Sequence, residues 1–212
     1  MNDNKLIGGI SGLYTKAHNK HIGGRVYRGG SGSVSGEAED LFALWLDGVL
    51  KARGVLIWVN PTIIFEKRVK TSATGRERKD YFKPDICVVE GEEGTEKTVR
   101  LLFELKMDLS RLGDFGAYAK KRGGIVRGLH RERAHCRVCS VTYDLSFEKG
   151  LQWIYAVFSP EYCRKDRMEK FKKKFGPSFF VLGNGHPNDD PASFKPDPGA
   201  FEALKTKILS SI

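Results

Sequence analysis

The pattern of apolar and polar positions changes at residue 35, where apolar side chains begin to recur at regular intervals. An acidic segment that starts at Ser35 precedes apolar positions with helical spacing, which predicts a helix with a favourable first turn. We expect this helix to end near Gly54 because glycine commonly follows the last helical turn. The apolar positions are Leu41, Phe42, Leu44, Trp45, Leu46, Val49 and Leu50.

Strand patterns follow this helix. Short β-branched and aromatic runs at 55–59 and 62–65 are broken by Asn60-Pro61, which predicts strand material with a kink or a turn between the runs. Two longer strands are predicted at 81–90 and 98–107, and the glycines and charges between them suit a hairpin connection. The intervening segment 67–79 is polar and basic, and we expect it to be a loop.

The second half of the chain alternates helices and strands. Helical spacing is visible over 108–123, and a basic helix is expected at 160–175. The continuous apolar run 151–158 predicts a buried central strand, and a further strand is expected at 178–182. A terminal helix begins near Pro198. The predicted order is therefore helix, three strands, helix, strand, helix, strand, helix, which indicates one α/β domain.

Composition sets the boundaries of that domain. A length of 212 residues suits one ordinary domain, and 40% hydrophobic with 29% charged residues excludes wholesale disorder. Residues 1–34 are rich in Gly, Ser and basic side chains and are expected to form a mobile or loosely packed basic arm. Residues 35–212 form the predicted folded domain.

The charge favours a polyanionic partner. The chain has 36 Lys and Arg against 26 Asp and Glu, a formal charge of +10, and such an excess gives non-specific affinity for phosphates. A charge that serves only solubility is the alternative. The candidate phosphate-contacting residues are Lys67, Arg68, Lys70, Arg76, Arg78, Lys79, Arg127, Arg131 and Arg133.

The chain has no predicted membrane span and no pattern typical of a disulfide-rich protein. No apolar run is long enough to span a bilayer and the first residues do not form a secretory signal, so a cytoplasmic location is expected. The four cysteines are expected to be reduced. Cys136 and Cys139, with His130 and His135 upstream, allow a compact zinc site, although free thiols are the favoured interpretation.

Two short segments carry candidate catalytic chemistry. Alternation along a strand places Glu104 and Lys106 on one face, where we expect both to be exposed, and Phe103 and Leu105 on the other, in the core. If the preceding strand pairs with this one, Asp85 lies beside Glu104. Two carboxylates suit Mg²⁺, with Mn²⁺ as a substitute, and such an ion assists phosphoryl chemistry. Lys106 would orient the attacking water or stabilise the developing charge.

This pattern resembles the PD-(D/E)xK nuclease superfamily, the restriction-endonuclease-like group, with Pro84-Asp85 at its PD and Glu104-Leu105-Lys106 at its ExK. The resemblance implies a three-layer α/β/α core with a central mixed sheet, running from about Ser35 to Leu182. It also implies metal-dependent cleavage of double-stranded or branched DNA, with Asp85, Glu104 and Lys106 as catalytic residues. The family's two-strand cleavage further implies a homodimer.

The resemblance also implies a third acidic residue from the first helix. Glu39 and Glu37 both qualify, and Glu39 is favoured because its helical spacing to the apolar residues aims it inward. The alternative is that both acids only complement the helix dipole.

Other interpretations of the motif stay open. The same core supports a Holliday-junction resolvase or DNA-repair nuclease in place of a restriction-type enzyme. A catalytically inactive nucleic-acid-binding module belongs to a different functional class. An exposed Pro-Asp turn with a surface Glu-Lys pair is the interpretation without any active site.

Overall fold

The computed structural model describes most of the chain, and the described residues fall into two compact units. Unit 1 comprises Met1–Val49, Leu105–Gly113 and Tyr155–Lys207, and unit 2 comprises Leu50–Glu104, Asp114–Ile154 and Ile208–Ile212. The described residues are 1–18, 21–23, 26–27, 35–71, 77–91, 94–108, 126, 128–160, 169–173, 176–184 and 194–212.

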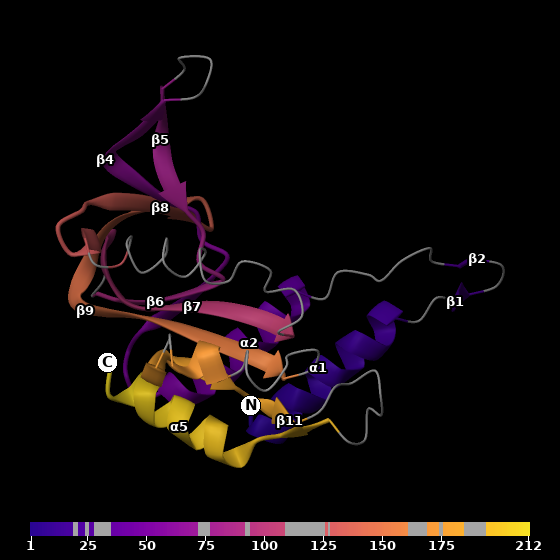
Figure 1. Ribbon diagram of the computed structural model, residues 1–212. Helices are drawn as coiled ribbons and strands as arrows, with labels where there is room; N and C mark the ends of the chain where they lie inside the picture. Colours follow the sequence, from indigo (N-terminus) through magenta and orange to yellow (C-terminus); the bar gives the residue numbers. More distant parts are fainter. Residues whose placement is uncertain are drawn as a thin grey trace. The chain divides into compact units, whose positions relative to one another are not determined.

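The described elements give a mixed α/β protein whose main sheet is mostly antiparallel (Figure 1). The sheet order is β3-β6-β7-β9-β8-β4-β5, and β10 pairs with β9 in parallel. The predicted α/β class and the mixed sheet are confirmed. The helices are α1 (Asp3–His18), α2 (Ser35–Leu50) and α5 (Pro198–Leu209), with a short 3-10 turn at Gly176–Ser178. The strands are β1 (His21–Gly23), β2 (Val26–Tyr27), β3 (Leu56–Val59), β4 (Ile63–Thr71), β5 (Glu77–Phe82), β6 (Ile86–Glu90), β7 (Glu96–Asp108), β8 (Ala134–Val138), β9 (Val141–Ser159), β10 (Phe179–Val181), β11 (Gly183–Asn184) and β12 (Lys195–Pro196).

In unit 1, the predicted first helix is confirmed as α2 and its apolar face is buried. The Phe42 ring lies 5.1 Å from Trp45 and 6.1 Å from Phe158 on β9, between ring centroids. Trp45 in turn contacts Phe201 of α5 at 5.5 Å. The terminal helix is also confirmed as α5. The Asp197 side chain caps it by accepting a 3.0 Å hydrogen bond from the Ala200 N–H.

Residues 3–18 of the expected N-terminal arm form α1. The expected loose packing is wrong for the first part of this helix, where Leu6, Ile7 and Ile10 are at most 1% exposed. A side chain at Gly9 would place its Cβ 2.9 Å from the Leu41 side chain, so glycine permits α1 to lie close against α2. Asp3 accepts a 2.9 Å hydrogen bond from the Trp45 indole. The boundary expected at residue 35 stays a prediction.

Unit 2 contains more strands than the sequence predicted. The basic segment 67–79 is not a simple loop, because β4 continues to Thr71 and pairs with β5 from Glu77 onward (Figure 1). The single strand expected at 81–90 is divided by Lys83-Pro84-Asp85 into β5 and β6. β6 has β3 and β7 as neighbours, whereas β5 lies at the end of the sheet order. The hairpin expected between β6 and β7 is confirmed.

The apolar run expected as a central strand belongs to a longer strand, β9, which begins with a hairpin. β8 and β9 are joined by Cys139-Ser140, and both residues have positive φ angles, 48° and 69°. Aromatic rings fill the core beneath this part of the sheet: Phe65 stacks on Phe82 at 5.4 Å, and Phe82 contacts Trp153 at 6.0 Å.

Two predicted helices lie partly or wholly outside the described residues. The helix expected at 108–123 falls on residues of which only the first, the end of β7, is described. Of the basic helix expected at 160–175, residues 169–173 are described and helical. No described helix is long and apolar enough to cross a membrane.

Candidate active site

Backbone hydrogen bonds hold Asp85 at the start of β6. Its N–H donates to the Phe103 carbonyl of β7 at 3.1 Å, and its own carbonyl accepts from the Asn60 N–H at 2.8 Å. Asn60 has a φ of 51°, a left-handed conformation that asparagine tolerates better than most residues. The turn between β3 and β4 therefore fixes Asp85 from one side and β7 fixes it from the other.

The strand register brings Asp85 and Glu104 together. Ile86 pairs with Phe103 and Cys87 with Leu102 in the antiparallel β6–β7 ladder. The Asp85 N–H bonds to the Phe103 carbonyl, and Glu104 is the next residue of β7, so the backbones of Asp85 and Glu104 lie close together. The proximity expected from the sequence is therefore present in the backbone, one residue beyond the regular β6–β7 ladder.

Burial differs along this face of β7. Glu104 is 3% exposed, whereas Asp85 and Lys106 are half-buried. The expectation that Glu104 and Lys106 are both exposed is wrong for Glu104. Phe103 and Leu105 are 0% and 7% exposed, as predicted for the core-facing positions. A carboxyl group withdrawn from water beside a second carboxyl is a feature of functional sites more often than of stabilising ones.

A β-bulge separates this site from the turn of the hairpin. The register shifts between Val88 and Val89, which leaves Arg100 as the extra residue of β7. The Arg100 guanidinium forms ion pairs with Glu90 at 3.3 Å and with Glu148 at 2.6 Å. Bulges redirect side chains and are frequent near active sites. Arg100 therefore forms surface ion pairs at the turn end of β7, whereas Glu104 is buried at the other end of the strand.

The two candidate acids of the first helix differ in exposure. Glu39 is 8% exposed and Glu37 is exposed, so the inward direction favoured for Glu39 is confirmed. Its participation in a metal site stays a prediction. Within the described part of the chain, no three Asp, Glu, His or Cys side chains are grouped to hold a metal ion. Asp85 and Glu104 are the carboxylate pair on which a metal site would depend.

The described candidate phosphate-contacting residues lie on two strands, β4 and β5, and on the segment that precedes β8. Arg131 and Arg133 are exposed beside the start of β8, and the Arg131 Nε donates to His130 at 3.2 Å. Arg76 and Arg127 lie outside the described residues. The remaining five occupy strands instead of a loop: Lys67, Arg68 and Lys70 belong to β4, and Arg78 and Lys79 belong to β5.

The cysteine pair does not form the compact zinc site that the sequence allowed. Cys136 is buried in β8, its neighbour His135 points to the opposite face, and Cys139 is exposed in the turn. Burial raises the pKa of the Cys136 thiol, which disfavours the thiolate that zinc requires. Both are free cysteines, as is buried Cys87.

The sequence did not identify the groove beside the candidate site. It has a volume of about 670 Å³, and Asn60 lines it from the turn that holds Asp85. Its other walls come from β4 and the β8–β9 hairpin, and that hairpin lacks the Asn-Gly or Asp-Gly signal that would have revealed it. Comparison of the chain with protein-family models, curated proteins and solved structures found no match.

Proposed function

We propose that this chain is a divalent-metal-dependent DNA endonuclease of the PD-(D/E)xK, restriction-endonuclease-like kind. The observation that carries the proposal is the proximity of Asp85 and Glu104, since the Asp85 N–H donates a 3.1 Å hydrogen bond to the carbonyl of Phe103, the residue before Glu104. Lys106 follows two residues after Glu104 on the same strand. The three-layer core and the restriction-type activity are part of this proposal.

The donor set fits Mg²⁺, with Mn²⁺ as a substitute. Mg²⁺ prefers oxygen ligands and uses only one or two protein carboxylates, with water and phosphate oxygens as the rest. Asp85 and Glu104 would hold the ion, which would also offset the repulsion between the two carboxylates. When bound, such an ion polarises a phosphoryl oxygen and lowers the pKa of water.

The protein's own residues would then position and stabilise the reacting groups. In phosphodiester hydrolysis, a water oxygen bonds to phosphorus and the P–O bond to the leaving oxygen breaks. One water proton passes to solvent, and the leaving oxygen takes up a proton. The Lys106 ammonium would stabilise the negative charge that develops on the phosphate oxygens. Because Glu104 is 3% exposed, charges act there in a medium of lower dielectric constant than water.

DNA is the proposed substrate because the chain is strongly basic. The formal charge of +10 favours binding to a phosphate backbone, and exposed Arg131 and Arg133 are available for such contacts. A homodimer is included in the proposal because a single active centre cuts one strand of a duplex.

A cleavage assay with matched variants tests the proposal. The purified chain is incubated with plasmid, branched DNA and RNA, each with Mg²⁺, Mn²⁺, Ca²⁺ or EDTA. We expect DNA cleavage with Mg²⁺ and Mn²⁺, none with Ca²⁺ or EDTA, and none by Glu104→Gln, while the control Glu90→Gln cleaves normally. Full activity in EDTA, or in Glu104→Gln, would exclude this site. Cleavage of branched DNA alone would identify a resolvase.

A further inference from the structure

One face of unit 2 combines an exposed aromatic ring with basic side chains. The register aligns Tyr81 of β5 with Ile64 of β4, and Ile64 with His135 of β8. Because directly paired residues share a face, these three side chains form one row across the sheet. Tyr81 is 59% exposed, whereas the next residue, Phe82, is 5% exposed in the aromatic core. We call this the Tyr81 face.

The basic side chains of the Tyr81 face follow one strand. Arg133, His135 and Arg137 alternate along β8 and its first flanking residue, and strand geometry places all three on the same face. Arg133 and Arg137 are exposed. Two exposed acids share the face, Glu66 at β4 and Asp144 on β9. The two arginines therefore lie along β8 with one acidic residue on each side of the strand.

The groove beside the candidate active site opens onto the same face. His135 and Arg137 line it, and the Arg137 partner Thr142 contributes a hydroxyl group. Asn60 closes one side and donates its N–H to the Asp85 carbonyl at 2.8 Å. The groove's volume of about 670 Å³ lies within the range of about 300–1,000 Å³ that holds small ligands. The groove thus adjoins the residue proposed to bind metal.

We propose that the Tyr81 face binds an unpaired, single-stranded segment of nucleic acid. A base would stack on the Tyr81 ring, and the backbone phosphates would follow Arg133 and Arg137 along β8. A duplex fits this face less well, since its bases already stack on one another and leave no free face for the ring. Aromatic rings beside a basic track are the usual means of binding single strands. The proposal rests on the proposed function for its substrate and adds that the substrate contains unpaired nucleotides.

Equilibrium binding in EDTA tests this surface without cleavage. Fluorescence anisotropy is measured for labelled single-stranded DNA, single-stranded RNA and blunt duplex DNA of about 16 nucleotides, a length that fills a typical site. We expect Tyr81→Ala to weaken single-strand binding about five- to 150-fold, which corresponds to the loss of one stacked base. Tyr81→Phe should bind like the parent. The matched control Leu56→Ala also shortens an exposed side chain, 49% exposed on β3, and should have no effect.

A salt titration separates stacking from phosphate contact. Arg137→Gln should reduce the slope of log affinity against log salt by about 0.7, the value for one phosphate contact on a single strand. Tyr81→Ala should leave that slope unchanged. Comparison of the affinities for single-stranded DNA and single-stranded RNA shows whether the sugar contributes to binding.

The outcomes distinguish this inference from the nuclease proposal. Single-strand binding that is unchanged in Tyr81→Ala, or reduced equally in Leu56→Ala, overturns the inference even if the parent cleaves DNA. Equal losses for duplex and single strand also overturn it. Selective loss in Tyr81→Ala supports the inference even if the parent cleaves nothing, in which case only the proposed nuclease activity fails.

Discussion

Acidic residues lie at both ends of the β6–β7 hairpin, and they differ in exposure and in the side chains beside them. At the turn end, Glu90 and Glu148 both pair with Arg100, and the three side chains are 24–45% exposed. At the other end, Asp85 is bonded to the Phe103 carbonyl next to Glu104, and Glu104 is 3% exposed whereas Asp85 is half-buried. One end of the hairpin thus has a surface ion-pair network, and the other end has a buried carboxyl group beside a half-buried one.

The difference in exposure separates two kinds of acidic residue. Opposite charges near water attract weakly and cost little to desolvate, so the turn end is compatible with stability alone. A carboxyl group withdrawn from water is more frequent at functional sites than on ordinary surfaces. If Asp85 and Glu104 form the proposed site, substitutions at the two ends of the hairpin should have different effects.

The largest expected effect is loss of cleavage on neutralising Asp85 or Glu104. Asp85→Asn and Glu104→Gln keep side-chain size but remove the charge that would hold a divalent ion, so plasmid cleavage should fall to background. DNA binding in EDTA should persist or tighten, since carboxylate repulsion of phosphate is removed. Both are measured on the same preparations by a cleavage time course and anisotropy.

The matched control lies at the other end of the same hairpin. Glu90→Gln removes one acid from the Arg100 network and should leave the cleavage rate at the parental value. If Glu90→Gln lost activity to the same extent as Glu104→Gln, the two ends would not differ in function and the comparison would be broken.

The next largest effect concerns the opposite face of β7. Phe103 is 0% exposed, and its carbonyl accepts the Asp85 hydrogen bond through the backbone, which substitution of the side chain leaves in place. Phe103→Ala should therefore lower the free energy of unfolding by about 3–5 kcal/mol. Cleavage per folded molecule should change far less.

Urea unfolding and a cleavage assay normalised to the folded fraction measure this separation. A variant that unfolds at the parental urea concentration would show that Phe103 is not in a packed core. The assignment of strand faces, and with it the placement of Glu104, would then be wrong.

Much of the fold follows from sequence patterns, and the failures have particular physical causes. The helical spacing of apolar residues and the residues at the helix ends predict α2 and α5. The polar, glycine-containing connection predicts the β6–β7 hairpin. α1 was missed because Gly8, Gly9 and Gly12 suggest a flexible segment, whereas Gly9 allows close packing against Leu41. The β8–β9 hairpin was missed because Cys139-Ser140 occupies a turn that normally requires Gly or Asn.

The proximity of the candidate residues was predictable, but their environment was not. A short motif predicts that Asp85 and Glu104 lie close together, and the hydrogen bond from the Asp85 N–H to the Phe103 carbonyl agrees with that expectation. The burial of Glu104 could not be predicted, because alternation assigns a residue to a face and does not say what covers the face. The bulge at Arg100 and the groove beside Asn60 depend on contacts between distant segments, which no local pattern encodes.

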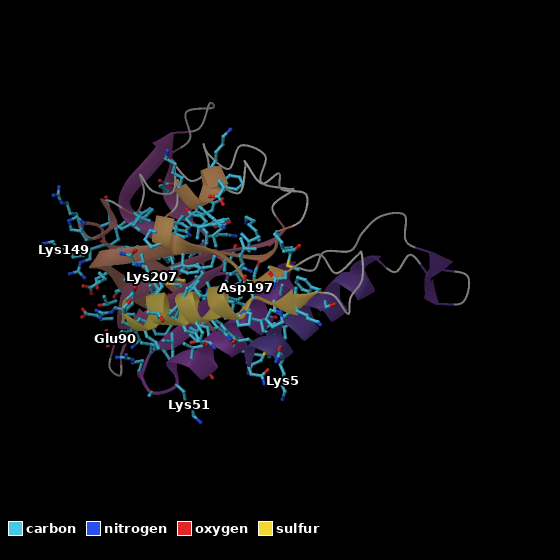
Figure 2. All side chains as sticks on the ribbon, turned by 60° about the horizontal axis from the view of Figure 1, so that its bottom comes forward. Lys5, Lys51, Glu90, Lys149, Asp197 and Lys207 are labelled. Carbon is cyan, nitrogen blue, oxygen red and sulfur yellow. The ribbon has the colours of Figure 1, made fainter. Side chains whose placement is uncertain are left out.

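Substitution of Lys106 is expected to lower the cleavage rate less than substitution of Asp85 or Glu104. If its ammonium stabilises charge only in the transition state, Lys106→Ala should lower kcat about 100- to 1,000-fold with little change in KM or in the metal concentration required. Lys149 is the control: it is exposed on β9 and extends outward in Figure 2, so Lys149→Ala should cleave normally. Parental activity in Lys106→Ala would remove Lys106 from the proposed site and leave the carboxyl pair to be tested by itself.

The smallest effect is expected at the turn end. Glu148→Gln removes the 2.6 Å ion pair with Arg100, but Arg100 keeps its contact with Glu90, and Glu148 is 39% exposed, where water screens the interaction. The free energy of unfolding should fall by only about 0.2–1 kcal/mol, and the difference should shrink further at high salt. Urea unfolding at two salt concentrations measures both quantities. A loss of several kcal/mol that salt does not alter would mean that the network behaves as a buried ion pair. The contrast between the two ends of the hairpin would then rest on charge sign alone, not on exposure.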